Sequence, residues 1–182
     1  PALKQMSAQQ YETFRLAVTA LVEADRKISL FEYALQRALL RNLAPHFTQV
    51  ARPATHYYAL GQLGRECSVV LSALAHFGAS DDTTAAEAFN AGAAALLRES
   101  AGLAAERLPF LRRAECSLSD FDAALGKLVS MSPALKRMFL EACETAVATD
   151  RAVTLEEGEL LRVVADSLDV PVPPLVPGQR VG

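Results

Sequence analysis

The sequence predicts an all-α protein of about seven helices, and three observations support this fold class. Hydrophobic residues make up 51% of the 182 residues, with alanine and leucine prominent and few β-branched runs, which is typical of helical proteins. Apolar residues recur in steps of three and four along most of the chain, the spacing of one helix face. No segment alternates apolar and polar residues as a half-buried strand does.

The N-terminal part predicts two helices. Ser7 and Gln10 have the spacing of a capping box, in which each side chain accepts a hydrogen bond from the other residue's backbone N–H. A first helix is therefore expected over about residues 8–24. Ser29 opens a second helix, which should end near Pro45 because proline interrupts helical hydrogen bonding. The apolar residues that share one face of this helix are Phe31, Leu35, Ala38 and Leu39.

The middle of the chain predicts a long helix and another capping box. Apolar residues repeat at helical spacing over 60–77, and Gly78 follows as a residue that commonly ends helices. Thr84 and Glu87 have capping-box spacing and should start the next helix. The alanine-rich stretch of that helix, 85–95, fits a core face as well as a dimer surface.

The next segment, 103–118, is predicted to be a short helix and a loop, because Pro109 breaks its regularity. Ser119 should begin a helix that runs through about Val129.

Two further helices follow in the C-terminal part. Ser132 is expected as an N-cap with Pro133 at the first helical position, and Thr154 should open the last helix. We therefore expect one helical domain over 1–169, followed by a proline-rich extended tail over 170–182.

Charge and hydropathy exclude several classes of function. The formal charge of −3 comes from 18 basic and 21 acidic residues spread along the chain, without a basic stripe, so a nucleic-acid partner is not expected. No apolar run approaches the roughly 18–20 residues that a membrane-spanning helix needs. Because the chain begins PALKQM, without an initiator methionine, we expect it to be part of a longer protein.

The three cysteines indicate a reducing compartment such as the cytoplasm. They are odd in number and form no C-x-x-C pair. Cys67 and Cys143 lie within apolar helical stripes and are predicted to be buried, inert thiols, while Cys116 lies in the less regular segment.

One pattern, D-R-x-[I/V]-[S/T]-L-x-E, occurs twice, in ADRKISLFEY at 24–33 and in TDRAVTLEEG at 149–158. In each copy a hydroxyl residue is followed three positions later by glutamate, which again predicts a capping box. Each copy would join two helices, and two such hairpins can pack about a pseudo-twofold axis. The repeated residues are Asp25, Ser29 and Glu32 in the first copy and Asp150, Thr154 and Glu157 in the second.

Three interpretations of the repeated turn remain open: helix capping, a divalent-cation site, or a surface for a partner. A cation would use hard carboxylate oxygens, but calcium loops of the EF-hand kind need about twelve residues with alternating ligands and a glycine. Arg26 and Arg151 instead place positive charge in the turn. The residues that would hold a cation are Asp25, Glu32, Asp150 and Glu157.

This turn, early and late in an all-helical chain, resembles the tellurite-resistance TerB-like family. The chain departs from that family at Arg26 and Arg151, where the family usually has glycine and often further acidic residues. The chain also resembles the C-terminal cytoplasmic region of some bacterial HtpX-like membrane zinc metallopeptidases. The stretches that carry this second resemblance are VEADRKISLFEYALQRAL, AFNAGAAAL, SPALKRMFLEAC and ELLRVVADSLDVPVPPL.

The resemblance implies a non-catalytic domain at the cytoplasmic face of the inner membrane, attached to a peptidase that holds the zinc. Its partner would be another protein or its own protease domain. The alternative is a divalent-metal-binding or stress-response module of the tellurite-resistance kind.

The chain by itself is not expected to be an enzyme or to hold a cofactor. A zinc peptidase needs H-E-x-x-H, and none of His46, His56 and His76 is followed by glutamate or paired at that spacing. G-x-S-x-G, phosphate-binding and dinucleotide-binding glycine motifs are also absent from the sequence.

Overall fold

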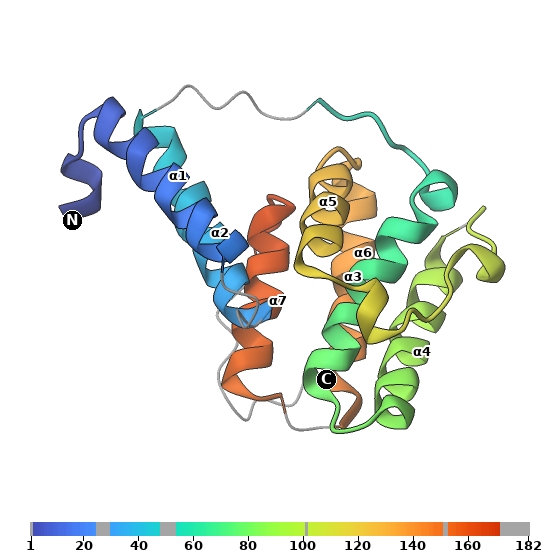
Figure 1. Cartoon of the computed structure of the whole chain (residues 1–182). Coiled ribbons are helices and arrows are strands. Elements are labelled where there is room, and N and C mark those ends of the chain that lie inside the picture. The colour runs from blue at the N-terminus through green and yellow to red at the C-terminus, as the bar shows by residue number, and fades with distance from the viewer. Residues whose placement is uncertain (1, 25–29, 48–53, 101, 151–152, 172–182) are drawn as a thin grey trace. The chain divides into compact units, whose positions relative to one another are not determined.

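The computed structural model describes residues 2–24, 30–47, 54–100, 102–150 and 153–171, and in them the chain is all-helical, as predicted (Figure 1). These residues form seven α-helices and five short 3-10 turns, without a strand. Contacts divide the chain into two compact units, an N-terminal unit (Pro1–Arg52) and a C-terminal unit (Pro53–Gly182). No helix of the described part is long and apolar enough to cross a membrane.

The N-terminal unit consists of a 3-10 turn (Ala2–Gln5) and two contacting helices, α1 (Ala8–Ala24) and α2 (Leu30–Phe47). The predicted capping box at the start of α1 is confirmed: the Ser7 N–H donates to Gln10 Oε1 at 2.8 Å, and the Gln10 N–H donates to Ser7 Oγ at 3.2 Å.

Aromatic packing connects the first turn of α1 with the last residue of α2. The rings of Tyr11 and Phe47 stack with their centroids 4.6 Å apart. The prediction that α2 ends near Pro45 is close to the structure, in which the helix continues through Pro45 and ends two residues later at Phe47. Proline removes only one N–H and its φ is helical, so the last turn can form around it. The stacked Phe47 ring adds a contact that favours this continuation.

The C-terminal unit packs four helices around α3, which contacts each of them. The most extensive helix pair is α4 with α6. Phe121 and Phe139 are among the largest fully buried side chains. The helices of this unit are α3 (Gly64–Gly78), α4 (Asp82–Glu99), α5 (Leu118–Leu128), α6 (Pro133–Val147) and α7 (Leu155–Ser167).

The predicted long helix over 60–77 is divided in the structure. Leu60–Gln62 form a 3-10 turn, and α3 begins only at Gly64. Gly64 is required by a close approach, since a Cβ there would lie 2.3 Å from the carbonyl oxygen of Arg107. The first residue of α3 therefore lies against a segment that is distant in sequence.

Two predicted helix starts are displaced. The N-cap of α4 is Asp81 rather than Thr84, whose N–H donates to Asp81 Oδ1 at 2.9 Å. The N-cap of α5 is Ser117 rather than Ser119, and Ser117 forms a capping box with Asp120. In both places an equally suitable capping residue lies two or three positions earlier, so the local pattern does not distinguish the two starts.

The other starts and the irregular segment are close to expectation. Ser132 caps α6 with Pro133 in the first turn, as predicted. The segment 103–118 contains two 3-10 turns, Ala105–Arg107 and Arg113–Glu115, instead of the expected short helix. Most of the predicted tail, 170–182, lies outside the described residues.

Candidate functional site

The repeated turn is described in its second copy only. Asp25 and Ser29 lie outside the described residues, so the capping box predicted for the first copy and the pseudo-twofold relation stay predictions. Glu32 is exposed in the first turn of α2, in the N-terminal unit. In the C-terminal unit, Asp150 ends a 3-10 turn (Ala148–Asp150), and Glu157 is buried in the first turn of α7.

The capping box predicted for the second copy is confirmed. The N–H and the hydroxyl of Thr154 both donate to Glu157 Oε2, each at 2.8 Å. In return the Glu157 N–H donates to Thr154 Oγ1 at 3.2 Å. The turn thus fixes the position of the Glu157 carboxylate as well as the start of α7.

The carboxylate of Glu157 approaches the end of α3 very closely. Glu157 is only 5% exposed, and a Cβ placed on Gly78 would lie 2.1 Å from its Oε1. The predicted helix end at Gly78 is correct. Gly78 does not, however, have the left-handed backbone conformation that glycine often adopts at a helix end. A residue with a side chain at this position would therefore displace Glu157.

A cavity of about 100 Å³ opens beside this contact. Helices α3, α4, α6 and α7 and the 3-10 turn after α6 contribute its walls, which are mostly alanine and aliphatic side chains with two carboxylates and two hydroxyls. The lining residues are Leu74, Ala75, Gly78, Ala79, Thr84, Glu87, Ala88, Ala146, Val147, Thr149 and Glu157.

The described residues contain no group of three or more His, Cys, Asp and Glu side chains placed to share a metal ion. Two of the four residues suggested as cation ligands, Asp25 and Asp150, have no described side chain. A metal role for Asp25, Glu32, Asp150 and Glu157 therefore stays a prediction.

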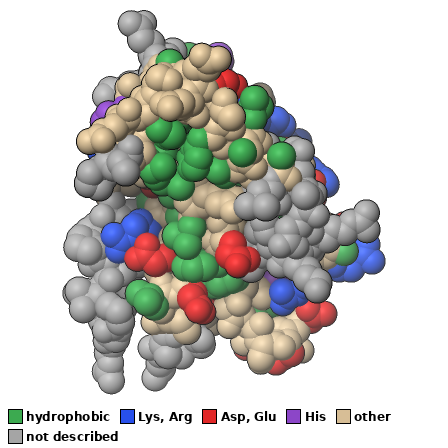
Figure 2. Space-filling view, turned by 60° about the vertical axis from the view of Figure 1, so that its left-hand side comes forward, with side chains coloured by type: hydrophobic (Ala, Val, Ile, Leu, Met, Phe, Trp, Pro, Cys, Tyr) green, Lys and Arg blue, Asp and Glu red, His purple; other side chains and the backbone are tan. Residues whose placement is uncertain are grey.

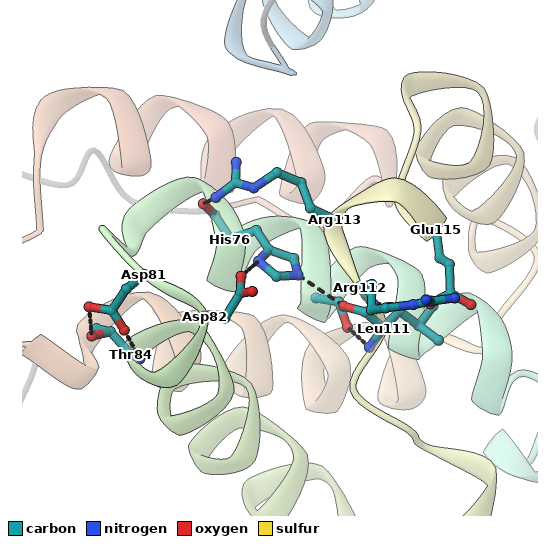
Figure 3. A network of polar contacts seen from close by, with 9 residues as sticks. His76, Asp81, Asp82, Thr84, Leu111, Arg112, Arg113 and Glu115 are labelled. Atoms are coloured by element: carbon teal, nitrogen blue, oxygen red, sulfur yellow. Dashed lines mark hydrogen bonds and ion pairs between the residues drawn. The ribbon is translucent and has the colours of Figure 1, made fainter.

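A second polar cluster surrounds His76, which is 4% exposed on α3 (Figure 3). Its Nε2 lies 2.9 Å from the carbonyl oxygen of Leu111, so this nitrogen carries a hydrogen and donates it. Its Nδ1 faces Oδ1 of the exposed Asp82 at 3.8 Å, beyond hydrogen-bond distance. The ring also packs against Phe110, with centroids 5.0 Å apart.

These contacts attach the irregular segment 103–118 to α3. Leu111 N–H donates to Ser72 Oγ at 3.0 Å, and the Arg113 guanidinium donates to the carbonyl oxygen of His76 at 2.8 Å (Figure 3). The His76 side chain thus has a structural use, as expected of a histidine near a helix end. Sequence reasoning did not find its partners, because they lie in a loop without a motif of its own.

Comparison of the chain with protein-family models, curated proteins and solved structures found no match. The resemblance to TerB-like domains and to the HtpX-like peptidase region therefore enters the proposal below as a sequence-based expectation.

The capping box predicts the effect of changing Thr154. Thr154→Ala removes the side chain that accepts from the Glu157 N–H, and we expect a loss of about 1 kcal/mol in the free energy of unfolding. Thr154→Ser keeps the hydroxyl and should stay within a few tenths of a kcal/mol of the parent. Urea unfolding of the three proteins gives both values. Equal stability of the alanine and serine variants would mean that the cap does not contribute.

The cysteines predict a pattern of thiol reactivity. Burial raises the pKa of Cys67 and Cys143, which are fully buried, as the sequence predicts. Partial burial, helped by the charges of Glu115 and Asp120, raises the pKa of Cys116 to about 11. With that pKa, only about a thousandth of Cys116 is thiolate at pH 8, against about a quarter of a free cysteine.

Reaction with a chromogenic disulfide at pH 8 should therefore show one thiol reacting about two orders of magnitude more slowly than free cysteine. The other two should react only on unfolding. Cys116→Ser should abolish the native-state phase, and raising the pH toward 11 should accelerate it in the parent. Rapid reaction of all three thiols in the folded protein would contradict their placement.

Proposed function

We propose that this chain is a non-catalytic, protein-binding domain of a membrane-bound zinc metallopeptidase and that it acts on the cytoplasmic side of the membrane. The attachment to a peptidase is inferred from the resemblance of four stretches of the chain to that region of HtpX-like enzymes. The binding role is supported by one structural observation, the exposed leucines of the N-terminal unit.

The exposed leucines are concentrated in the smaller unit. Leu16 on α1 is 55% exposed, and Leu35 and Leu39 on α2 are 43% and 38% exposed. Leu35 and Leu39 are four residues apart and therefore project from the same side of α2. Figure 2 shows hydrophobic side chains at the surface of one face of the molecule, with acidic side chains between them.

Periodicity marked Leu35 and Leu39 as members of one apolar helix face, yet this face is only partly buried. Accessible leucines on a helix are typical of surfaces that bind protein, because covering them gains roughly 25 cal/mol per Å² of apolar area. A two-helix unit of this size also buries little apolar surface of its own. We call Leu35 and Leu39, which project from the same side of α2, the leucine surface and propose it as the site for the partner.

The test uses the full-length parent peptidase in cells. Deleting residues 1–169 should change its substrate choice, its localisation or its regulation. The double variant Leu35→Glu/Leu39→Glu should reproduce this change, because it places charge in an interface that must exclude water. Proteolysis of the parent's substrates and fractionation of the parent protein are the measurements.

The matched control is Leu155→Glu, which changes a leucine that is 64% exposed in the other unit and should leave proteolysis unchanged. Circular dichroism and thermal unfolding of the purified variants establish that all of them fold. If the deletion leaves substrate choice, localisation and regulation as they were, the proposed function is wrong. If only the double variant has no effect, the partner binds elsewhere on the domain.

A further inference from the structure

The carboxylate of Glu157 uses only one of its two oxygens in hydrogen bonding. Both donors of Thr154 reach Oε2, while Oε1 lies over Gly78 and receives no hydrogen bond from the described residues. Glu157 is only 5% exposed, but its Oε1 is not one of the fully enclosed polar atoms that lack a hydrogen bond, so it faces accessible space beside it. This oxygen is therefore available to a ligand that brings its own donor.

The space for such a ligand is the cavity of about 100 Å³, which Glu157 and Gly78 both line. The absence of a Cβ at Gly78 is what allows Oε1 to lie at this edge of the cavity. The capping box holds the carboxylate there, so the position is set before any ligand arrives.

The charges around the cavity select a cation. Glu87, on α4, supplies a second carboxylate to the lining. The last residues of α3 and α6 also line the cavity, and the C-terminal end of a helix carries partial negative charge. The N-terminal ends of α4 and α7 carry partial positive charge, and the carboxylates of Asp81 and Glu157 already compensate it. Among the described lining residues none is Lys, Arg or His.

The apolar part of the wall selects the kind of cation. Ca²⁺ and Mg²⁺ prefer six or more oxygen ligands, waters included, whereas much of this wall consists of side chains such as Leu74, Ala88 and Val147. An ammonium group on a short alkyl chain fits both parts. Its N–H donors can bond to the Glu157 carboxylate, and its methylenes can contact the aliphatic wall. The volume suits a few heavy atoms, since a cavity of about 150 Å³ holds benzene.

We propose that this cavity binds a primary alkylammonium group, with Glu157 Oε1 as its main acceptor and Glu87 as a second negative charge. The group would be the head of a free alkylamine or the end of a lysine side chain on a protein. Both sources present the same chemistry to the cavity, and the experiment below distinguishes them.

The test is an NMR titration of the ¹⁵N-labelled full chain with n-butylammonium chloride at constant ionic strength. We expect binding in the millimolar range, with shifts concentrated in the amides of Gly78, Ala79, Ala88 and Val147. The neutral isostere n-butanol should bind at least about tenfold more weakly, because it cannot make a charge-assisted hydrogen bond. Nα-acetyl-lysine methylamide is titrated in parallel. Tighter binding than butylammonium indicates a protein lysine, and weaker binding a free amine.

The key variant is Glu157→Gln, which removes the charge while keeping a side chain that can complete the capping box. The chain already contains a capping box with glutamine in this position, formed by Ser7 and Gln10 at the start of α1. We expect about tenfold weaker binding of butylammonium. Glu156→Gln is the matched control, since it removes a neighbouring exposed charge from α7 that does not line the cavity, and it should change binding less than about twofold.

Three results would overturn the proposal. The first is the absence of localised shifts with butylammonium in the unmodified chain. The second is equal binding of butylammonium and butanol. The third is an equal effect of Glu157→Gln and Glu156→Gln. If MgCl₂ or CaCl₂ shifts these amides and butylammonium does not, the cavity is a metal site and the proposal is likewise wrong.

Discussion

Phe139→Ala should lower the free energy of unfolding by about 3–5 kcal/mol. Phe139 is fully buried on α6, the helix that makes the most extensive contact with α4 and also packs against α3. Truncation removes the transfer free energy of the ring and leaves a cavity that three helices would have to close. Because those helices are fixed by their other contacts, the cavity should persist.

The measurement is urea unfolding of the full chain followed by circular dichroism. Leu155→Ala is the control, because Leu155 is 64% exposed in the first turn of α7 and its truncation should cost less than about 0.5 kcal/mol. A loss below about 1 kcal/mol for Phe139→Ala would show that the ring is not part of a packed core.

Gly92→Val should destabilise the chain by at least about 2 kcal/mol, for the opposite reason, overpacking. A Cβ at Gly92 would lie 2.7 Å from the carbonyl oxygen of Ala142 and 2.9 Å from the Cβ of Ala146. Both contacts are with α6, and neither atom belongs to a flexible side-chain end. Valine would therefore have to push α4 and α6 apart.

Gly126→Ala is the matched control for this prediction. Gly126 is an exposed glycine inside α5, and a Cβ there would meet nothing within 4 Å. Alanine should therefore stabilise the chain by roughly 0.5–1 kcal/mol, the difference in helix propensity. Unfolding midpoints that move in opposite directions for the two variants are the expected result. Movement in the same direction would contradict the close approach at Gly92.

The contrast between these glycines shows where local sequence stops being informative. Both lie inside helices, yet of the two only Gly92 is required by packing. The same holds for the alanine-rich stretch 85–95, which fitted a core face or a dimer surface. Ala85 and Ala93 are buried, and the adjacent Gly92 lies against α6, so this face belongs to the core.

The sequence could predict the capping box of the candidate site but not the cavity beside it. The capping box of Thr154 and Glu157 involves residues three positions apart, so the sequence contained all that was needed to predict it. The cavity beside it requires Gly78, Glu87 and Val147 from three other helices. Their meeting depends on how the helices pack, and no short motif encodes that.

The two proposals concern different units of the chain and can be tested separately. The leucine surface belongs to the N-terminal unit, and the ammonium cavity belongs to the C-terminal unit. A substitution that abolishes partner binding by the leucine surface should leave ammonium binding by the cavity unchanged, and the reverse should also hold.

By itself the sequence determined the all-α class and the starts of α1, α6 and α7, because periodicity and capping act over three to seven residues. It determined that Cys67 and Cys143 are buried, since both lie within strong apolar stripes. Only the tertiary structure decided that Leu35 and Leu39 remain exposed, and that Glu157 reaches Gly78. These outcomes depend on contacts between residues far apart in the chain, which a local pattern cannot specify.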